Sequence, residues 1–119
     1  MINSKELALD IANWAYDHKA SKIEILEIEQ VSLIADYFVI MHANNRSLTM
    51  ALADYIGDEV EAKYQLPPTH KEGQQSGEWL LLDFGTVIVH IFLEEIRQFY
   101  DIERLWIDAP RLAFVPSQN

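Results

Sequence analysis

The chain has no cysteine, no long apolar run and few basic side chains, and each absence narrows the chemistry available to it. Without cysteine it has no disulfide bonds, thiolate metal ligands or thiol nucleophiles, and a reducing compartment is the simplest environment. No segment approaches the roughly 18 consecutive apolar residues of a membrane-spanning helix, and residues 1–6 lack the basic start of a signal peptide. We therefore expect a cytoplasmic protein without a membrane or targeting segment.

Basic residues are outnumbered, because nine Lys and Arg stand against nineteen Asp and Glu and give a formal net charge of -10. This charge repels nucleic-acid phosphates and anionic lipid headgroups, so we expect no membrane partner and no direct sequence-specific binding of nucleic acid. The same charge attracts basic partners over a screening length of about 8 to 10 Å, although acidity also favours solubility by itself. Composition leaves both explanations open.

The motifs of common enzymes and metal sites are missing as well. The four histidines show no His-Glu-x-x-His pattern, and no serine lies in a nucleophile elbow. Residues 43–47, between a predicted strand and a predicted helix, can offer backbone donors to an anion, although helix capping is the simpler explanation. A nucleotidyltransferase needs paired carboxylates on a strand to hold a divalent cation, and the predicted hairpin at residues 79–92 offers only Asp83. We expect no metal, no cofactor and no enzymatic activity.

What the chain does contain is a large apolar fraction. Half of its 119 residues are hydrophobic, and they include three Trp, five Tyr and five Phe. A domain of this size buries roughly two thirds of the surface that its unfolded chain exposes. We expect one independently folding domain at residues 1–109 and an irregular tail at residues 110–119, because Pro110 and Pro116 interrupt regular structure.

Local patterns in the first third of the chain predict one helix and two strands. Asn3 and Glu6 have the spacing of a capping box, and apolar residues at helical intervals extend the predicted helix to about Lys19. Residues 22–29 and 36–41 are rich in β-branched side chains, which predicts two strands, the second more buried than the first.

The middle of the chain predicts a second helix and a loop. Asn44 or Asn45 caps this helix, and Pro67 stops it. Residues 69–78 turn polar, which indicates a loop with a short edge strand at its start. The stripe that we expect the helix to bury is Leu48, Ala51, Leu52, Tyr55 and Ile56.

The last third of the chain begins with a β-hairpin. Residues 79–83 and 87–92 flank a Phe-Gly-Thr turn, which is a strong hairpin signal. Two short helices are predicted to follow, one at residues 94–100 and one that Asp101 caps and that ends at Trp106. Helices and strands together give an α/β fold class.

The two faces of the predicted hairpin differ in character. A tight turn pairs odd positions of the first strand with even positions of the second, so the side chains can be sorted by face. One face is purely aliphatic and should pack under the two long helices, with Leu82 and Val89 almost fully buried. This face carries Leu80, Leu82, Val87, Val89, Ile91 and Leu93.

The other hairpin face mixes large apolar groups with ionisable ones, which suits a binding surface, and Trp is frequent among interface hot spots. Alternatively, Ile96, Phe99 and Trp106 of the last helices cover this face while Asp83 and His90 satisfy each other. The pattern leaves both alternatives open. The residues on this face are Trp79, Leu81, Asp83, Ile88, His90 and Phe92.

Three segments, in this order and spacing, resemble the ribosomal silencing factor family, also called Iojap-related proteins. They are residues 35–40 (ADYFVI), 79–90 (WLLLDFGTVIVH) and 97–109 (RQFYDIERLWIDA). The resemblance implies a single domain with a mixed β-sheet flanked by helices, similar to nucleotidyltransferases but without their catalytic carboxylates. It also implies binding to the large ribosomal subunit through its protein L-fourteen, a block on association with the small subunit, and repression of translation under nutrient limitation.

The resemblance further implies a binding surface, which carries over most clearly to Trp79, Asp83, His90, Arg97 and Tyr100. This favours an exposed mixed face of the hairpin, and the acidic charge suits ribosomal proteins, which are mostly basic. Four further positions belong either to this surface or to the core. They are Leu81, Phe92, Leu105 and Trp106.

This sequence departs from the family pattern at a few positions. Ala43 stands where the family usually has glycine after its second strand, Thr86 follows Gly85 where the family commonly has Asp, and Ile107 replaces a frequent glycine. These changes leave the Trp79 surface intact. Two competing hypotheses are a residual nucleotidyltransferase-like enzyme and a homodimeric scaffold with another partner.

Overall fold

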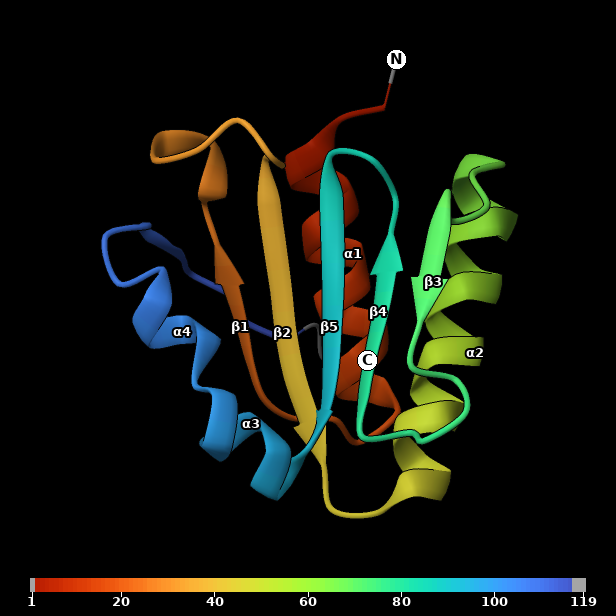
Figure 1. Cartoon of the computed structure of the whole chain (residues 1–119). Helices are drawn as coiled ribbons and strands as arrows, with labels where there is room; N and C mark the ends of the chain where they lie inside the picture. The colour runs from red at the N-terminus through yellow and green to blue at the C-terminus, as the bar shows by residue number, and fades with distance from the viewer. Residues whose placement is uncertain (1, 117–119) are drawn as a thin grey trace.

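The structure is a computed structural model that describes residues 2–116 (Figure 1). Its helices and strands are interspersed along the chain, as the sequence predicts. They are α1 (Ser4–Asp17), β1 (Ser21–Leu26), the 3-10 helix η1 (Ile28–Gln30), β2 (Tyr37–Ala43), α2 (Arg46–Tyr64), β3 (His70–Glu72), β4 (Trp79–Asp83), β5 (Val87–Leu93), α3 (Glu94–Tyr100), α4 (Ile102–Leu105) and β6 (Arg111–Leu112).

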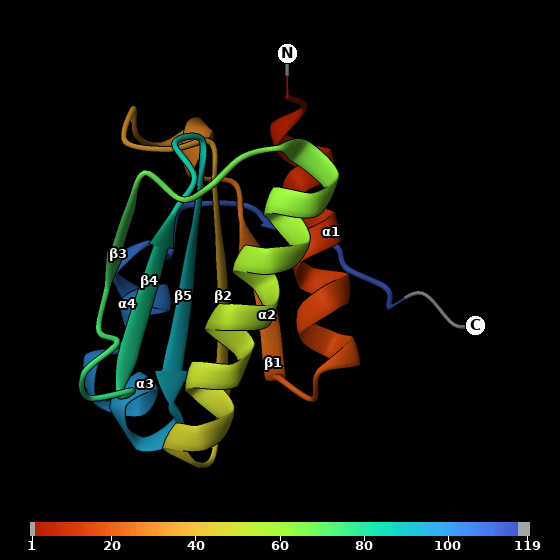
Figure 2. The ribbon, with the colours of Figure 1, turned by 90° about the vertical axis from the view of Figure 1, so that its right-hand side faces the viewer.

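The strands form one six-stranded mixed sheet in the order β3-β4-β5-β2-β1-β6, which confirms the predicted fold class. β2 and β5 run parallel, and the other neighbours pair antiparallel. α1 and α2 lie side by side on one face of the sheet, whereas α3 and α4 lie on the other (Figures 1 and 2). The crossover through α2 makes the β2–β5 parallel pair possible, since parallel strands cannot be joined by a tight turn.

The first helix begins as predicted. The Asn3 side chain accepts a hydrogen bond from the backbone N–H of Glu6 at 3.0 Å, which satisfies one of the orphan donors at the helix start. Leu7, Ile11 and Ala15 recur at helical spacing and are fully buried against the sheet. The predicted helix is therefore confirmed.

The buried stripe of α2 was predicted only in part. Asn45 is the cap, and Leu52 and Ile56 are buried as expected, but Ala51 is exposed. The hydroxyl of Thr49 donates to the carbonyl oxygen of Gly77 at 2.7 Å, and this contact helps set the rotation of the helix. The buried positions are consequently Thr49, Leu52, Ala53, Ile56 and Val60.

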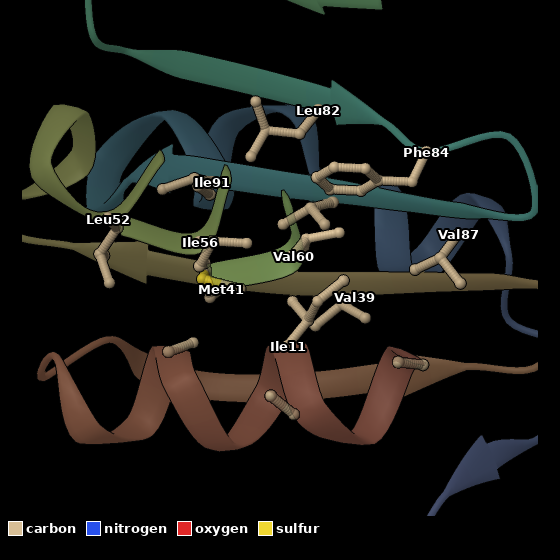
Figure 3. Close-up of a cluster of buried hydrophobic side chains, with 14 of the residues drawn as sticks. Ile11, Val39, Met41, Leu52, Ile56, Val60, Leu82, Phe84, Val87 and Ile91 are labelled. Atoms are coloured by element: carbon tan, nitrogen blue, oxygen red, sulfur yellow. The ribbon is translucent and has the colours of Figure 1, made fainter. Parts of the chain in front are cut away.

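The hairpin register confirms the predicted parity, because Trp79 pairs with Phe92 and Leu81 pairs with His90. Leu82 is 2% exposed and Val89 is 0% exposed, so the aliphatic face is buried as predicted. Figure 3 shows Leu82 in this core, between the sheet and the two long helices. Each such side chain contributes about 1.5 to 3 kcal/mol to the free energy of unfolding, which orients the hairpin and turns its mixed face away from α1 and α2.

The segment after Ala109 is not wholly irregular, which corrects the prediction of a tail. Arg111 and Leu112 form β6 and pair with Leu26 and Ile25 of β1 at the edge of the sheet. The Arg111 guanidinium also donates to Glu24 at 3.2 Å. Pro110 does not prevent this pairing, because its carbonyl oxygen accepts a hydrogen bond from Glu27 instead of requiring an N–H.

Two further boundaries differ from expectation. The first predicted strand ends at Leu26, because Ile28 begins the 3-10 helix η1. Asp101 joins α3 to α4 with a φ of 46°, and its side chain does not cap α4. The backbone N–H of Asp101 instead donates to the carbonyl oxygen of Arg97, which closes α3 with a left-handed residue.

Candidate protein-binding surface

The mixed face of the hairpin is partly covered, so each of the two sequence-based alternatives holds for part of it. α3 and α4 lie over β1 and β2, and in Figure 1 the face of β4 toward the viewer has no helix in front of it. At the covered side, Phe92 is buried in an apolar cluster that includes Phe38 and Ile102, and His90 is buried beside it. Four residues stay half-buried and form an accessible strip, namely Trp79, Leu81, Asp83 and Ile88.

Trp79 is held firmly within this strip. Its ring centroid lies 4.8 Å from that of Phe92 and 5.0 Å from that of Tyr100. Its indole N–H donates to Nδ1 of His90 at 3.2 Å. One side of the ring borders a hollow of about 320 Å³ shared with Leu81 and Gly73. Trp79 therefore has the properties of an interface anchor: a large, rigid aromatic group with an accessible edge.

His90 lies beneath Trp79 and is buried. Because its Nδ1 accepts the indole proton, the neutral ring carries its own proton on Nε2, which has no hydrogen-bond partner among residues 2–116. Burial lowers the pKa of His90 to about 4, so the ring is neutral at pH 7. The alternative in which Asp83 and His90 satisfy each other is wrong, and His90 positions Trp79 instead of facing solvent.

Asp83 stands at the opposite end of β4 and shapes the turn. Its Oδ1 accepts a hydrogen bond from the backbone N–H of Gly85 at 2.7 Å, and Gly85 has a φ of 90°. At a rise of about 3.4 Å per residue, Asp83 and Trp79 lie about 13 Å apart along the strand. The carboxylate is half-buried and adds a negative charge at one end of the accessible strip.

Arg97 is the buried centre of a polar network, and only 6% of it is exposed. Its Nε donates to Glu103 at 2.9 Å and its Nη1 to the carbonyl oxygen of Lys22 at 2.8 Å. Nη1 also donates to Nδ1 of His42 at 3.0 Å, and Nη2 contacts Glu24 at 3.3 Å. The guanidinium thus ties α3 and α4 to β1 and β2. It holds the helix that carries Tyr100 and presents little surface of its own.

The α3–α4 turn exposes a group of apolar side chains next to Trp79. Phe99 and Leu105 are each 78% exposed, and Tyr100 is about half exposed. The Tyr100 ring contacts both the Trp79 ring and the Phe99 ring at centroid distances of 5.0 Å. A hollow of about 570 Å³ is lined in part by Phe99, Tyr100 and Leu105. The hairpin–α3 surface is defined by Trp79, Leu81, Asp83, Ile88, Phe99, Tyr100 and Leu105.

The structure separates the four residues that the sequence left undecided. Leu81 and Leu105 belong to the surface, whereas Phe92 is fully buried. Trp106 is half-buried and packs edge-on against Phe38 with a centroid distance of 5.5 Å. Phe99 was expected among the covering residues, but it points outward.

Other apolar side chains are exposed away from the hairpin. Leu33 is fully exposed, and Val31 and Ile34 beside it are also accessible, in the loop between η1 and β2. Within residues 2–116, no three His, Asp or Glu side chains converge as metal ligands would. None of the helices in that range combines the length and apolar character of a membrane span.

The fold has solved counterparts. A crystal structure of a Chromobacterium violaceum protein superimposes with a TM-score of 0.78 at 26% identity, covering 96% of this chain and 91% of that chain. The agreement spans the whole domain and includes the mixed sheet that carries the hairpin–α3 surface. Fold and surface therefore define a class of α/β domains with a half-covered mixed sheet.

Sequence comparison defines the family within that class. The family model described as "Ribosomal silencing factor during starvation" matches residues 1–119. The Ribosomal silencing factor RsfS of Bacillus subtilis is 36% identical over 109 residues, which are 92% of each chain. The mouse protein named "Mitochondrial assembly of ribosomal large subunit protein 1" is 30% identical over 89 residues, 73% of this chain and 39% of that one. The chain belongs to the ribosomal silencing factor family, whose role is ribosome-associated regulation of translation.

Proposed function

We propose that this protein binds the large ribosomal subunit through ribosomal protein L-fourteen, blocks association with the small subunit and so represses translation when nutrients are limiting. Family membership supports a ribosomal partner, and the name of the mouse relative points to the large subunit. L-fourteen and the block on subunit joining come from the family resemblance of the three sequence segments. The site of action is the bacterial cytosol.

The observation that carries this proposal is the hairpin–α3 surface. It places a clamped aromatic anchor, Trp79, beside the exposed rings of Tyr100 and Phe99. Such exposed apolar groups in continuous contact are typical of protein-binding surfaces. Trp79, Asp83 and Tyr100 are the contact residues of the proposal, whereas His90 and Arg97 act from beneath by holding Trp79 and α3.

Charge supports the choice of a basic partner. The formal net charge of -10 accelerates encounter with a positively charged surface, and Asp83 lies within the proposed contact area. Long-range attraction and a rigid aromatic anchor act on different rates. The charge raises the association rate, while the anchor lowers the dissociation rate.

The test is sedimentation of the purified protein with separated ribosomal subunits, using Tyr100→Ala and the matched control Tyr16→Ala. Tyr16 is 50% exposed and Tyr100 is 53% exposed, but Tyr16 lies on α1, across the sheet from the hairpin–α3 surface. We expect Tyr100→Ala to weaken co-migration with the large subunit by about tenfold or more and Tyr16→Ala to change it little. Equal effects of the two substitutions would remove the hairpin–α3 surface from the proposal.

Subunit joining provides the functional readout. Protein added to large subunits before small subunits should reduce the yield of joined ribosomes, and Tyr100→Ala should restore that yield. Co-migration with the small subunit, or joining that proceeds normally at saturating protein, contradicts the proposed function. Sedimentation of the protein alone gives its oligomeric state and tests the homodimeric scaffold directly.

A further inference from the structure

A cleft opens at the carboxyl ends of β2 and β5, the parallel pair of the sheet. It lies at the lower edge of the sheet in Figure 1, where both arrows end and α2 begins, and it shares no residue with the hairpin–α3 surface. In open α/β sheets, small ligands bind outside the carboxyl ends of parallel strands. The cleft has a volume of about 640 Å³ and is lined by Lys19, Ser21, Lys22, His42, Ala43, Asn44, Leu48 and Glu94.

His42 supplies a buried donor at the floor of this cleft. Its side chain is 9% exposed, and its Nδ1 accepts a hydrogen bond from Arg97 at 3.0 Å. Because arginine only donates, the neutral His42 ring must carry its proton on Nε2. Within residues 2–116 the hydrogen bond of His42 is the one at Nδ1, and the Glu94 carboxylate lies 4.0 Å from Nε2, beyond hydrogen-bond distance. Burial and the Arg97 charge lower the pKa of His42, which keeps the ring neutral.

Two lysines add positive charge at the same place. Lys19 and Lys22 both line the cleft, and neither takes part in the ion pairs formed within residues 2–116. Both have left-handed backbone conformations, with φ values of 70° and 47°, so the chain is bent on either side of the strand start at Ser21. Two of only nine basic side chains therefore meet in one cleft of a strongly acidic protein.

The start of α2 adds the Asn44 side chain to the lining. Asn44 lines the cleft directly before the cap residue Asn45, whereas the N–H of Leu48, which also lines the cleft, already donates to the Asn45 side chain at 2.8 Å. The helix dipole places partial positive charge at the same end. Glu94 is the one acidic side chain of the lining and stands against two lysines, so the lining as a whole carries an excess of positive charge that favours an anion.

We propose that this cleft binds a phosphate-bearing small molecule, with the His42 Nε2–H, Lys19, Lys22 and the Asn44 side-chain amide as its donors. The volume exceeds the need of a lone phosphate and falls within the range of small-ligand sites. A second hollow, lined by Asp17, His18, Lys19 and Leu48, continues from the cleft. The His18 ring stacks on Tyr55 at a centroid distance of 3.4 Å and gives this extension an aromatic wall.

The test is an NMR titration of the full chain with inorganic pyrophosphate and, separately, with adenosine monophosphate. We expect saturable shifts at residues 19–22 and 42–48, with a dissociation constant below about 1 mM. The Nε2 signal of His42 should move as well, because it reports a hydrogen bond that a merely structural histidine would not form. Stronger binding of adenosine monophosphate would show that the extension takes the nucleoside, and equal binding would show that phosphate alone is recognised.

The double variant Lys19→Ala/Lys22→Ala should lose about tenfold or more in affinity, whereas Lys71→Ala, an exposed lysine on β3 away from the cleft, should not. No saturable shift up to about 10 mM of either probe would overturn the proposal. Equal loss in the two variants would do the same, since it would indicate non-specific attraction of anions. The measurement needs no ribosomes, so its outcome is separate from that of the proposed function.

Discussion

Replacing Arg97 by methionine should lower the stability of the fold without removing any atom from the surface that contacts the partner. The substitution keeps the apolar stem and deletes a guanidinium that donates to Glu103, His42 and the backbone of Lys22. Glu103 then remains with a buried carboxylate that has lost its cation, and its Oε1 already lacks a hydrogen-bond partner in the described structure. Removing one member of a buried ion pair is strongly destabilising for this reason.

The magnitude follows from the exposure of the partners. Buried pairs of this kind cost about 3 to 5 kcal/mol when one charge is removed. The Glu103 side chain is 17% exposed and loses most, whereas Glu24 is 40% exposed and is largely screened by water. We therefore expect a loss of about 3 kcal/mol in the free energy of unfolding, which lowers Tm by roughly 10 to 18 °C in a domain of this size.

The assay is urea unfolding followed by tryptophan fluorescence, with Arg104→Met as the matched control. Arg104 is exposed on α4 and forms no ion pair within residues 2–116, so its replacement should change stability by less than about 0.5 kcal/mol. If Arg97→Met keeps the stability of the parent protein but loses affinity for the large subunit, Arg97 is a contact residue. The role assigned to its buried network would then be wrong.

Two further predictions concern pH and charge. The folded-state pKa of His90 is lowered from 6.5 to about 4, so its contribution to stability is complete above pH 6.5 and is lost as pH falls toward 4. Urea titrations should show the free energy of unfolding falling by about 3 kcal/mol over this range, and the His90→Phe variant should not show this fall. An equal pH slope in that variant would contradict the assignment. Asp58 and Glu61 are exposed on α2, remote from the hairpin–α3 surface. Replacing both with lysine should modestly slow association with the large subunit and weaken the salt dependence of the association rate. Stopped-flow measurements should show an unchanged dissociation rate. An altered dissociation rate would place α2 in the contact.

The sequence predicted those features that depend on local periodicity. The hairpin faces followed from alternation, because a strand period of two fixes which side chains share a face whatever the rest of the chain does. The start of α1 could be predicted from Asn3, because a helix cap also depends only on residues close by in the chain. The rotation of α2 could not be predicted in this way, because a hydrogen bond from Thr49 to Gly77, which lies 28 positions away, helps to set it.

Buried polar groups of the candidate site were the least predictable part. Arginine is seldom buried, and the partners that allow it at position 97 lie 73 and 55 positions away, at Glu24 and His42. His90 has diagonal neighbours on the opposite strand at both Trp79 and Asp83. The strand pattern alone cannot choose between them. In the structure His90 pairs with Trp79, whereas the Asp83 carboxylate accepts from the N–H of Gly85 in the turn.

These buried groups explain how an exposed aromatic anchor remains ordered before its partner arrives. A free tryptophan side chain would lose rotamer freedom on binding, at a cost of about 0.5 to 1.5 kcal/mol. In this fold, the ring of Trp79 is already fixed by its hydrogen bond to His90 and by its packing between Phe92 and Tyr100. Tyr100 in turn depends on α3, which Arg97 ties to β1 and β2. Ordering is therefore completed on folding, so substitutions at buried His90 or Arg97 can weaken binding although neither residue needs to touch the partner.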